Sequence, residues 1–151
     1  MLTLDPELLG KEVSVGEVTV TAEEVRAFAE ATGDLDPLYL DTEAARQAGY
    51  PDCIAPPLFC MKIRGERALP DAEIGPGLVS LNAGQELEFY DEIYVGRTYA
   101  VSVKITDVYE KTGRSGPLGV LVRELLIRDT DGKPVVLMRE RRMVRSPEKK
   151  I

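Results

Sequence analysis

Residues 34–57 read DLDPLYLDTEAARQAGYPDCIAPP, and this stretch is the best guide to the fold of the whole chain. Its centre at 43–48 favours a short helix, with Asp41 or Thr42 as the cap and Gly49 as the stop. Its first four residues are rich in aspartate and proline, so we expect an irregular loop there. The stretch therefore predicts a loop, a small helix and a second loop.

A longer helix is predicted just upstream. The Thr21 hydroxyl can bond the amide of Glu24, and the Glu24 carboxylate can reach back, which makes a capping box. Apolar side chains then follow helical spacing, and Gly33 stands where this helix would end. Residues 6–9 favour a short helical turn, and residues 16–20 favour a brief strand.

A third helix is predicted downstream, because Pro56 and Pro57 suit a first helical turn. It could run to Ala68 or Leu69. Gly65 would cost about 1 kcal/mol relative to alanine inside it, so we expect something to pack closely against that position.

Four later segments read as strands: 78–90, 98–109, 117–128 and 133–145. Turn chemistry separates them at 92–96, 112–113 and 131–132, and the last is a strong hairpin signal. Helices that precede an antiparallel meander predict an α+β domain in which one helix lies across a curved sheet.

Composition limits the class of protein. The chain has 151 residues, of which 44% are hydrophobic and 30% charged, so we expect one globular domain at 1–146 and a flexible tail at 147–151. No apolar run approaches the roughly 20 residues of a membrane span, and residues 1–5 do not resemble a signal peptide. We therefore expect a cytoplasmic protein. The net charge of −7 argues against nucleic-acid binding.

The chain contains no histidine and two cysteines. Without imidazole, no side chain has an ordinary pKa near neutrality, and proton transfer would need a retuned carboxylate, tyrosine or lysine. A zinc site is not expected. We interpret Cys53 and Cys60 as free thiols, with a disulfide or redox pair as the minor alternative.

Two motifs in the opening stretch resemble the MaoC-like (R)-specific hydratases and dehydratases. Residues 34–41, DLDPLYLD, are similar to Asp-x-Asn-Pro-(Leu/Ile)-His-x-Asp. Residues 49–57, GYPDCIAPP, are similar to Gly-Phe-x-x-x-Ile-Ala-His-Gly. Residues 89–96, FYDEIYVG, resemble the family's strand–turn element. The resemblance covers nearly the whole chain and implies a hot-dog fold, an antiparallel β-sheet wrapped around a central α-helix.

In that family the first-motif Asp and His hold a water that is added to, or removed from, the 2,3 bond of an acyl thioester. The resemblance places Asp34 at the Asp position and Tyr39 at the His position as the catalytic pair. Tyrosine has an ordinary pKa near 10 and is a poor base at neutral pH. The catalytic pair is therefore expected to be inactive.

A second departure concerns the thioester carbonyl. The family's Gly offers it an amide N–H at a helix start, but the matching residue is Pro57, which has no N–H. Losing one such donor typically costs about 100- to 1,000-fold in rate. The resemblance also implies a substrate-binding set, namely Asp36, Ala55, Pro56, Pro57 and Lys62.

Both departures resemble the non-catalytic subunits of heteromeric dehydratases, such as the mycobacterial hydroxyacyl-acyl-carrier-protein dehydratases, and the degenerate N-terminal half of double-hot-dog hydratases. The resemblance implies a hetero-oligomer with a His-containing hot-dog subunit. It implies no cofactor beyond coenzyme A or acyl carrier protein as the carrier of the substrate. The alternatives are a non-catalytic acyl-CoA-binding homodimer, or a thioesterase that relies on Glu66 or Asp36.

Structural explanations compete with each functional one. Asp34, Asp36 and Asp41 are typical of loops and helix caps, and Tyr39 could simply line a tunnel.

The basic residues also allow two interpretations, a phosphate-binding one and a structural one. Lys62, Arg64 and Arg67 could reach phosphates of coenzyme A or form a solvated or subunit-facing stripe. Arg139 and Arg141 should share one strand face, either solvated or binding phosphate.

Overall fold

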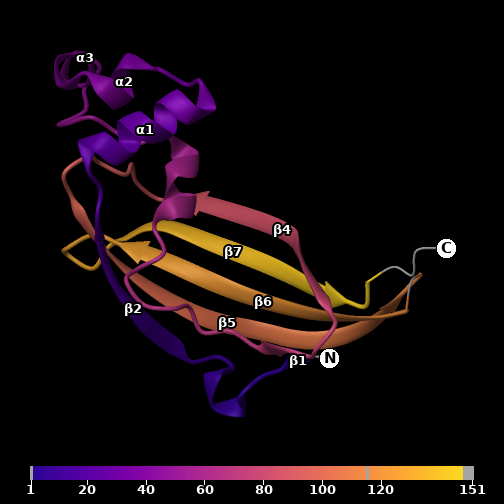
Figure 1. The fold of residues 1–151 in the computed structure, drawn as a ribbon. Coiled ribbons are helices and arrows are strands. Elements are labelled where there is room, and N and C mark those ends of the chain that lie inside the picture. Colours follow the sequence, from indigo (N-terminus) through magenta and orange to yellow (C-terminus); the bar gives the residue numbers. More distant parts are fainter. Residues whose placement is uncertain (1, 115, 148–151) are drawn as a thin grey trace.

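A five-stranded antiparallel sheet forms most of the protein (Figure 1). The structure is a computed structural model that describes residues 2–114 and 116–147. The strand order is β2-β5-β6-β7-β4. The strands comprise β2 (Glu12–Thr19), β4 (Val79–Phe89), β5 (Thr98–Gly113), β6 (Gly116–Arg128) and β7 (Pro134–Arg145). A small second sheet pairs β1 (Leu2–Thr3) with β3 (Glu73–Ile74).

Most of the helices gather at one end of the sheet (Figure 1). They comprise the 3-10 helices η1 (Pro6–Leu8) and η2 (Pro57–Lys62) and the α-helices α1 (Ala22–Thr32), α2 (Pro37–Leu40) and α3 (Thr42–Gln47). The predicted capping box at Thr21 is confirmed, and Asp41 caps α3. The loop predicted at 34–37 is shorter than expected, because Asp36 caps α2 and Pro37 begins that helix.

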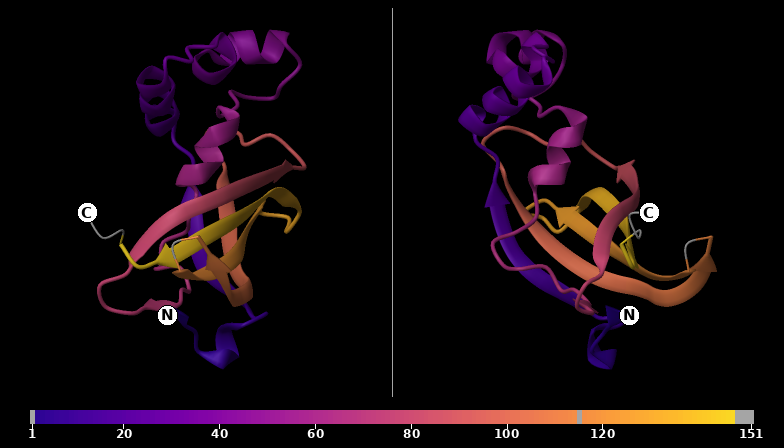
Figure 2. Two further views of the ribbon diagram at one scale, coloured as in Figure 1. Left: turned by 90° about the vertical axis from the view of Figure 1, so that its right-hand side faces the viewer. Right: turned by 45° about the vertical axis from the view of Figure 1, so that its right-hand side comes forward.

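The sheet curves, and η2 and the coil after it lie on its concave side (Figure 2). Buried apolar side chains of three strands meet there. They include Val101, Val103, Leu125, Ile127, Val136 and Met138. From η2 and its end, Phe59, Cys60 and Ile63 complete this core. Burial of these side chains is the main term that holds η2 on the sheet.

The long helix predicted from Pro56 to Leu69 is wrong beyond Lys62, where η2 ends. Gly65 adopts a positive φ of 81°, and a Cβ there would lie 2.5 Å from the carbonyl oxygen of Val15. The amides of Glu66 and Arg67 both donate to that same oxygen, at 2.8 and 3.0 Å. The close contact expected at Gly65 is therefore present, but β2 makes it, and it holds the chain in a coil.

The four predicted strands are present, with shifts at their ends. β5 continues through the turn expected at 112–113, because Gly113 still pairs with Gly116. The predicted 131–132 hairpin is closed by Asp129, whose Oδ1 accepts from the amides of Asp131 and Lys133, each at 2.9 Å.

Other expectations have mixed outcomes. Cys53 and Cys60 are buried free thiols, as predicted. The tail predicted at 147–151 falls almost wholly outside the described residues. Among the helices of the described chain, none has the length and apolar character that crossing a membrane requires.

Candidate functional site

The first motif folds into the short helix α2. Asp36 Oδ1 accepts from the amide of Leu38 at 2.9 Å, and proline at the first position fixes the φ that a helix needs. This places Tyr39 against the main core, half-buried. Asp34 and Asp36 remain exposed. Asp36 therefore has a structural role as a cap, and Tyr39 is partly buried, as are its neighbours Leu38 and Leu40.

Tyr39 loses its proton less readily than an ordinary tyrosine. Burial raises its pKa, and the negative charges of Asp34, Asp36 and Glu92 raise it further, with a small contribution from its hydrogen bond to Asp34. Each of these effects favours the neutral phenol. Tyr39 therefore keeps its proton at neutral pH, and its inactivity as a general base stays a prediction.

The second motif is held against a distant turn. The amide of Ala55 donates to the carbonyl of Ile93 at 2.7 Å, and the amide of Val95 donates to Cys53 at 2.9 Å. An isolated antiparallel bridge joins Ile54 to Tyr94 between them. Because the N–H of Ala55 is already hydrogen-bonded to Ile93, it is not free to donate to a ligand.

A cavity of about 310 Å³ opens beside this motif. We call it the Ala55 cavity; its lining comprises Ala55, Pro57, Phe89, Tyr90, Asp91, Glu92 and Ile93. The structure thus joins two of the predicted binding residues to the strand–turn element that follows β4. The motif at 89–96 was visible in the sequence, but its contact with Ala55 was not predicted. The wall combines aromatic side chains with two carboxylates.

Three consecutive residues at the expected oxyanion position provide no free donor. Ala55 is bonded to Ile93, and Pro56 and Pro57 have no N–H. The first N–H of η2 belongs to Leu58, one residue beyond the family position. The Ala55 cavity can hold an apolar or acyl group, but the motif gives no backbone donor for a developing negative charge.

The remaining predicted side chains lie elsewhere. Lys62 stands at the other end of η2, where its Nζ lies 5.6 Å from the centroid of the Phe59 ring. Glu66 is on the coil against Gly16 of β2, so the helix that was to carry a thioesterase base is absent. Lys62 stays a prediction as a substrate-binding residue.

The basic stripe expected on the long helix is also broken up. Arg64 turns toward β7 and donates to both carboxylate oxygens of Glu140, at 2.5 and 2.9 Å. Arg139 and Arg141 do share a face, as predicted, and both pair with Glu86 at 3.0 and 3.6 Å.

Comparison with known proteins matches this chain to a family whose description names a dehydratase region. Residues 7–138 match the family described as FAS1-like, dehydratase domain region. A UPF0336 protein of Saccharopolyspora erythraea is 31% identical over 139 residues, which cover 89% of this chain and 86% of that protein.

Two solved structures from Mycobacterium tuberculosis share the fold. A chain of the ChsH1-ChsH2 complex is 23% identical, with a TM-score of 0.72, over 93% of this chain and 85% of that one. A chain of the C-terminally truncated HadBC (3R-hydroxyacyl-ACP dehydratase) complex is 21% identical, with a TM-score of 0.70, over 93% and 99%. The predicted hot-dog fold is confirmed, with η2 and its coil on the concave side of the sheet.

Proposed function

Because this chain belongs to the MaoC-like hydratase/dehydratase family, we propose that it is the non-catalytic hot-dog subunit of an enoyl-thioester hydratase or 3-hydroxyacyl-thioester dehydratase. A separate hot-dog chain supplies the catalytic Asp and His. This chain supplies part of the acyl-binding wall and one half of a shared sheet. The acyl group is carried by coenzyme A or acyl carrier protein.

One observation carries the proposal: the motif lacks both parts of the catalytic machinery. Ala55, Pro56 and Pro57 offer no free amide, which by itself costs about 100- to 1,000-fold in rate. The base position holds Tyr39, whose pKa is raised by burial and by nearby carboxylates. A general base typically contributes about 100- to 10,000-fold more. Two independent losses of this size leave no useful rate for the chain alone.

The exposed edge strand β4 is a second reason to propose a partner chain. Within the part of the chain that the structure describes, it pairs with β7 alone, so its other side carries backbone groups with no strand partner. Large apolar side chains on and after it are exposed; these comprise Val79, Leu81, Phe89 and Tyr90. A long, apolar edge is a hazard unless another strand covers it. Extension of the sheet across β4 by a second hot dog would remove that hazard.

The position of the Ala55 cavity fits such an assembly. Phe89 ends β4 and Tyr90 follows it, and both line the cavity. A partner strand on β4 would bring the partner's residues to the cavity mouth, so that the acyl thioester would lie between the two chains. Two of the structural relatives are themselves named as complexes, ChsH1-ChsH2 and HadBC.

Reconstitution with a partner tests the proposal. The chain is co-expressed with a hot-dog protein that carries an intact Asp…His motif, and hydration of crotonyl-CoA is measured for the purified complex. We expect activity that disappears when the partner's motif histidine is replaced by alanine. Activity that survives that replacement would overturn the proposal. Acyl-CoA binding without turnover in every combination would favour a binding homodimer instead.

A further inference from the structure

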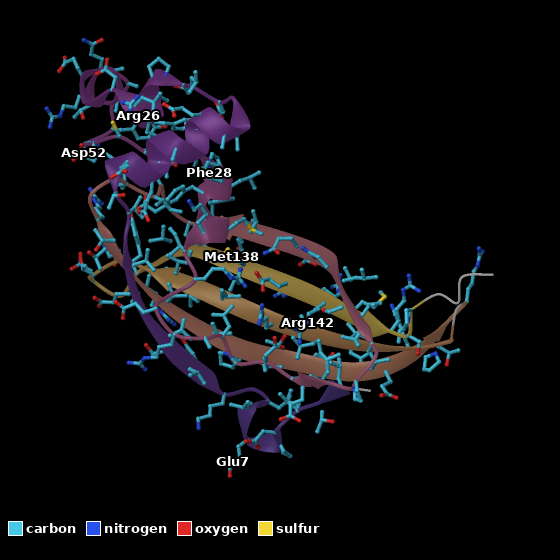
Figure 3. All side chains as sticks on the ribbon, in the orientation of Figure 1. Glu7, Arg26, Phe28, Asp52, Met138 and Arg142 are labelled. Atoms are coloured by element: carbon cyan, nitrogen blue, oxygen red, sulfur yellow. The ribbon has the colours of Figure 1, made fainter. Side chains whose placement is uncertain are left out.

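A second cavity of about 310 Å³ lies on the concave face, between the end of η2 and strands β4, β6 and β7. We call it the arginine cavity; the side chains that matter in it are Met61, Arg64, Gln85, Arg123, Glu140 and Arg142. On β7, Met138 and Arg142 lie on the same side of the sheet (Figure 3). The concave face thus changes along β7 from apolar core to charged groups.

The charges in this cavity are organised around two carboxylates. Glu140 accepts from Arg64 and also from Arg123, whose Nε lies 2.8 Å away. Burial alone would raise the pKa of Glu140, but the hydrogen bonds from the two arginines outweigh it and hold that pKa below its ordinary value. Asp71 binds Arg142 with both oxygens and lies 3.7 Å from Arg123. Both acids therefore serve as partners of the arginines.

The balance of charge is positive by one unit. Within the described residues, this network joins three guanidinium groups to two carboxylates. Arg141 also lines the cavity, but it pairs with Glu86 outside the network. The side chains of this network are 14% to 35% exposed, so water screens their charges only in part and an unbalanced positive charge there attracts anions. A single additional negative charge would balance the network.

Two buried donors in the same place lack acceptors. Among the described residues, Gln85 Nε2 and Arg142 Nε have no hydrogen-bond partner, although both atoms are buried. Both residues line the arginine cavity. Buried polar groups in folded proteins are almost always satisfied, so these two donors are open to an acceptor that the chain itself does not supply. An apolar side chain at position 85, such as methionine or leucine, would avoid the free-energy cost of burying an unpaired donor.

We propose that the arginine cavity binds a carboxylate carried by an extended aliphatic ligand. A carboxylate brings one negative charge and two acceptor oxygens in a plane, which matches one unit of excess charge and two unpaired donors. Phosphate is a poorer fit, because a second negative charge would exceed the single unit of excess positive charge in the network. Arg141, the other cation at the cavity, already pairs with Glu86. The aliphatic part has Met61 and Leu121 beside it.

The proposed function indicates which class of ligand carries this carboxylate, and the choice of that class rests on the proposed function. Phe89 in the Ala55 cavity and Gln85 in the arginine cavity are four residues apart on β4, or roughly 13 Å in a strand. Both cavities flank η2, with Pro57 in the first and Met61 in the second. The substrate is then the monothioester of a dicarboxylic acid, with its thioester at the Ala55 cavity and its free carboxylate in the arginine cavity.

Binding of simple probes to the full chain tests the carboxylate site. Octanoate, octanol and inorganic phosphate are each titrated by calorimetry. We expect octanoate to bind measurably, and octanol and phosphate not to bind. Gln85→Met should weaken octanoate about tenfold, the loss of one hydrogen bond to a charged group, while raising the melting temperature because an unpaired buried donor is gone. Glu17→Gln, on the exposed part of β2, is the matched control and should change neither.

The site is disproved if octanol or phosphate binds as well as octanoate, if octanoate does not bind, or if Gln85→Met binds it as the native chain does. In the reconstituted complex, kcat/KM for a monothioester of a dicarboxylic acid should exceed that for the plain acyl thioester of equal length, and equal values would overturn the substrate class. Crotonyl-CoA has no second carboxylate, so its hydration reports the proposed function alone. The two failures are therefore distinguishable.

Discussion

The amide of Ala55 donates to the carbonyl of Ile93 at 2.7 Å, and this bond removes the last backbone donor from the family's oxyanion position. The same bond holds the strand–turn element against the second motif and so shapes the Ala55 cavity. Pro56 and Pro57 extend the donor-free stretch. Under the proposed function, this geometry holds an acyl group but provides no backbone donor for charge that develops on its carbonyl.

Tyr39→Phe tests whether the tyrosine handles protons. Because burial and neighbouring carboxylates raise its pKa, we expect kcat/KM of the reconstituted complex to change by no more than about twofold. Removing a true acid or base costs about a hundredfold or more. A loss of that size would return Tyr39 to the catalytic machinery. Tyr109→Phe, which is far along β5 and partly exposed, is the control.

Gly65→Ala tests the contact that replaces the central helix. The positive φ and the 2.5 Å approach to Val15 together predict a loss of about 3 kcal/mol in the free energy of unfolding. Gly77→Ala is a matched control, since its φ is +75° with nothing within 4 Å; it should lose only about 1 kcal/mol. Urea denaturation measures both. Equal losses would show that the contact with β2 contributes nothing.

Glu140→Gln tests the ion-pair network. Removing a hydrogen-bonded carboxylate should lower the free energy of unfolding at neutral pH by about 2 kcal/mol. Because the folded pKa of Glu140 lies below its ordinary value of 4.5, its contribution is fully present above that pH and is lost as the pH falls through the folded value.

The variant should therefore lose less stability on acidification from neutrality than the native chain does. Urea titrations at a series of pH values check this, with Glu17→Gln as the control. If the free energy of unfolding falls equally with pH in the variant and the native chain, Glu140 does not stabilise the fold through its ionised form.

Charge on β4 tests the assembly edge. The double substitution Val79→Lys and Leu81→Lys places two ammonium groups on exposed positions, so the fold should be retained within about 0.5 kcal/mol per site. Co-purification with the partner should be lost, because strand addition would bury those charges. Leu9→Lys alters an exposed leucine away from this edge and should leave the complex intact. Sedimentation analysis distinguishes the outcomes.

The sequence predicted the features that depend on neighbouring residues, but not the contacts between residues far apart in the chain. The capping box at Thr21 and the hairpin at Asp131 depend on neighbouring residues, and both are present. The helix expected after Pro57 failed because its alternatives are tertiary: Gly65 meets Val15, and Arg64 reaches Glu140. No periodicity in one segment can reveal a partner on another strand.

The candidate site divides in the same way. Pro57 and Tyr39 could be identified from motif spacing alone. The α2 helix was also within reach, since proline after an aspartate is a helix-start signal. No motif in the sequence indicates the bond between Ala55 and Ile93 or the unpaired donors at Gln85 and Arg142, because they depend on how distant segments meet in space.

A titration of this chain with its partner tests the central claim most directly. A fixed amount of the chain is mixed with increasing amounts of a His-containing hot-dog partner, and the rate of crotonyl-CoA hydration is followed. We predict no enzymatic rate at zero partner and a rise that saturates at one partner per chain. A kcat of about 1 s⁻¹ or more, the usual range for enzymes, from the pure chain alone would contradict the account.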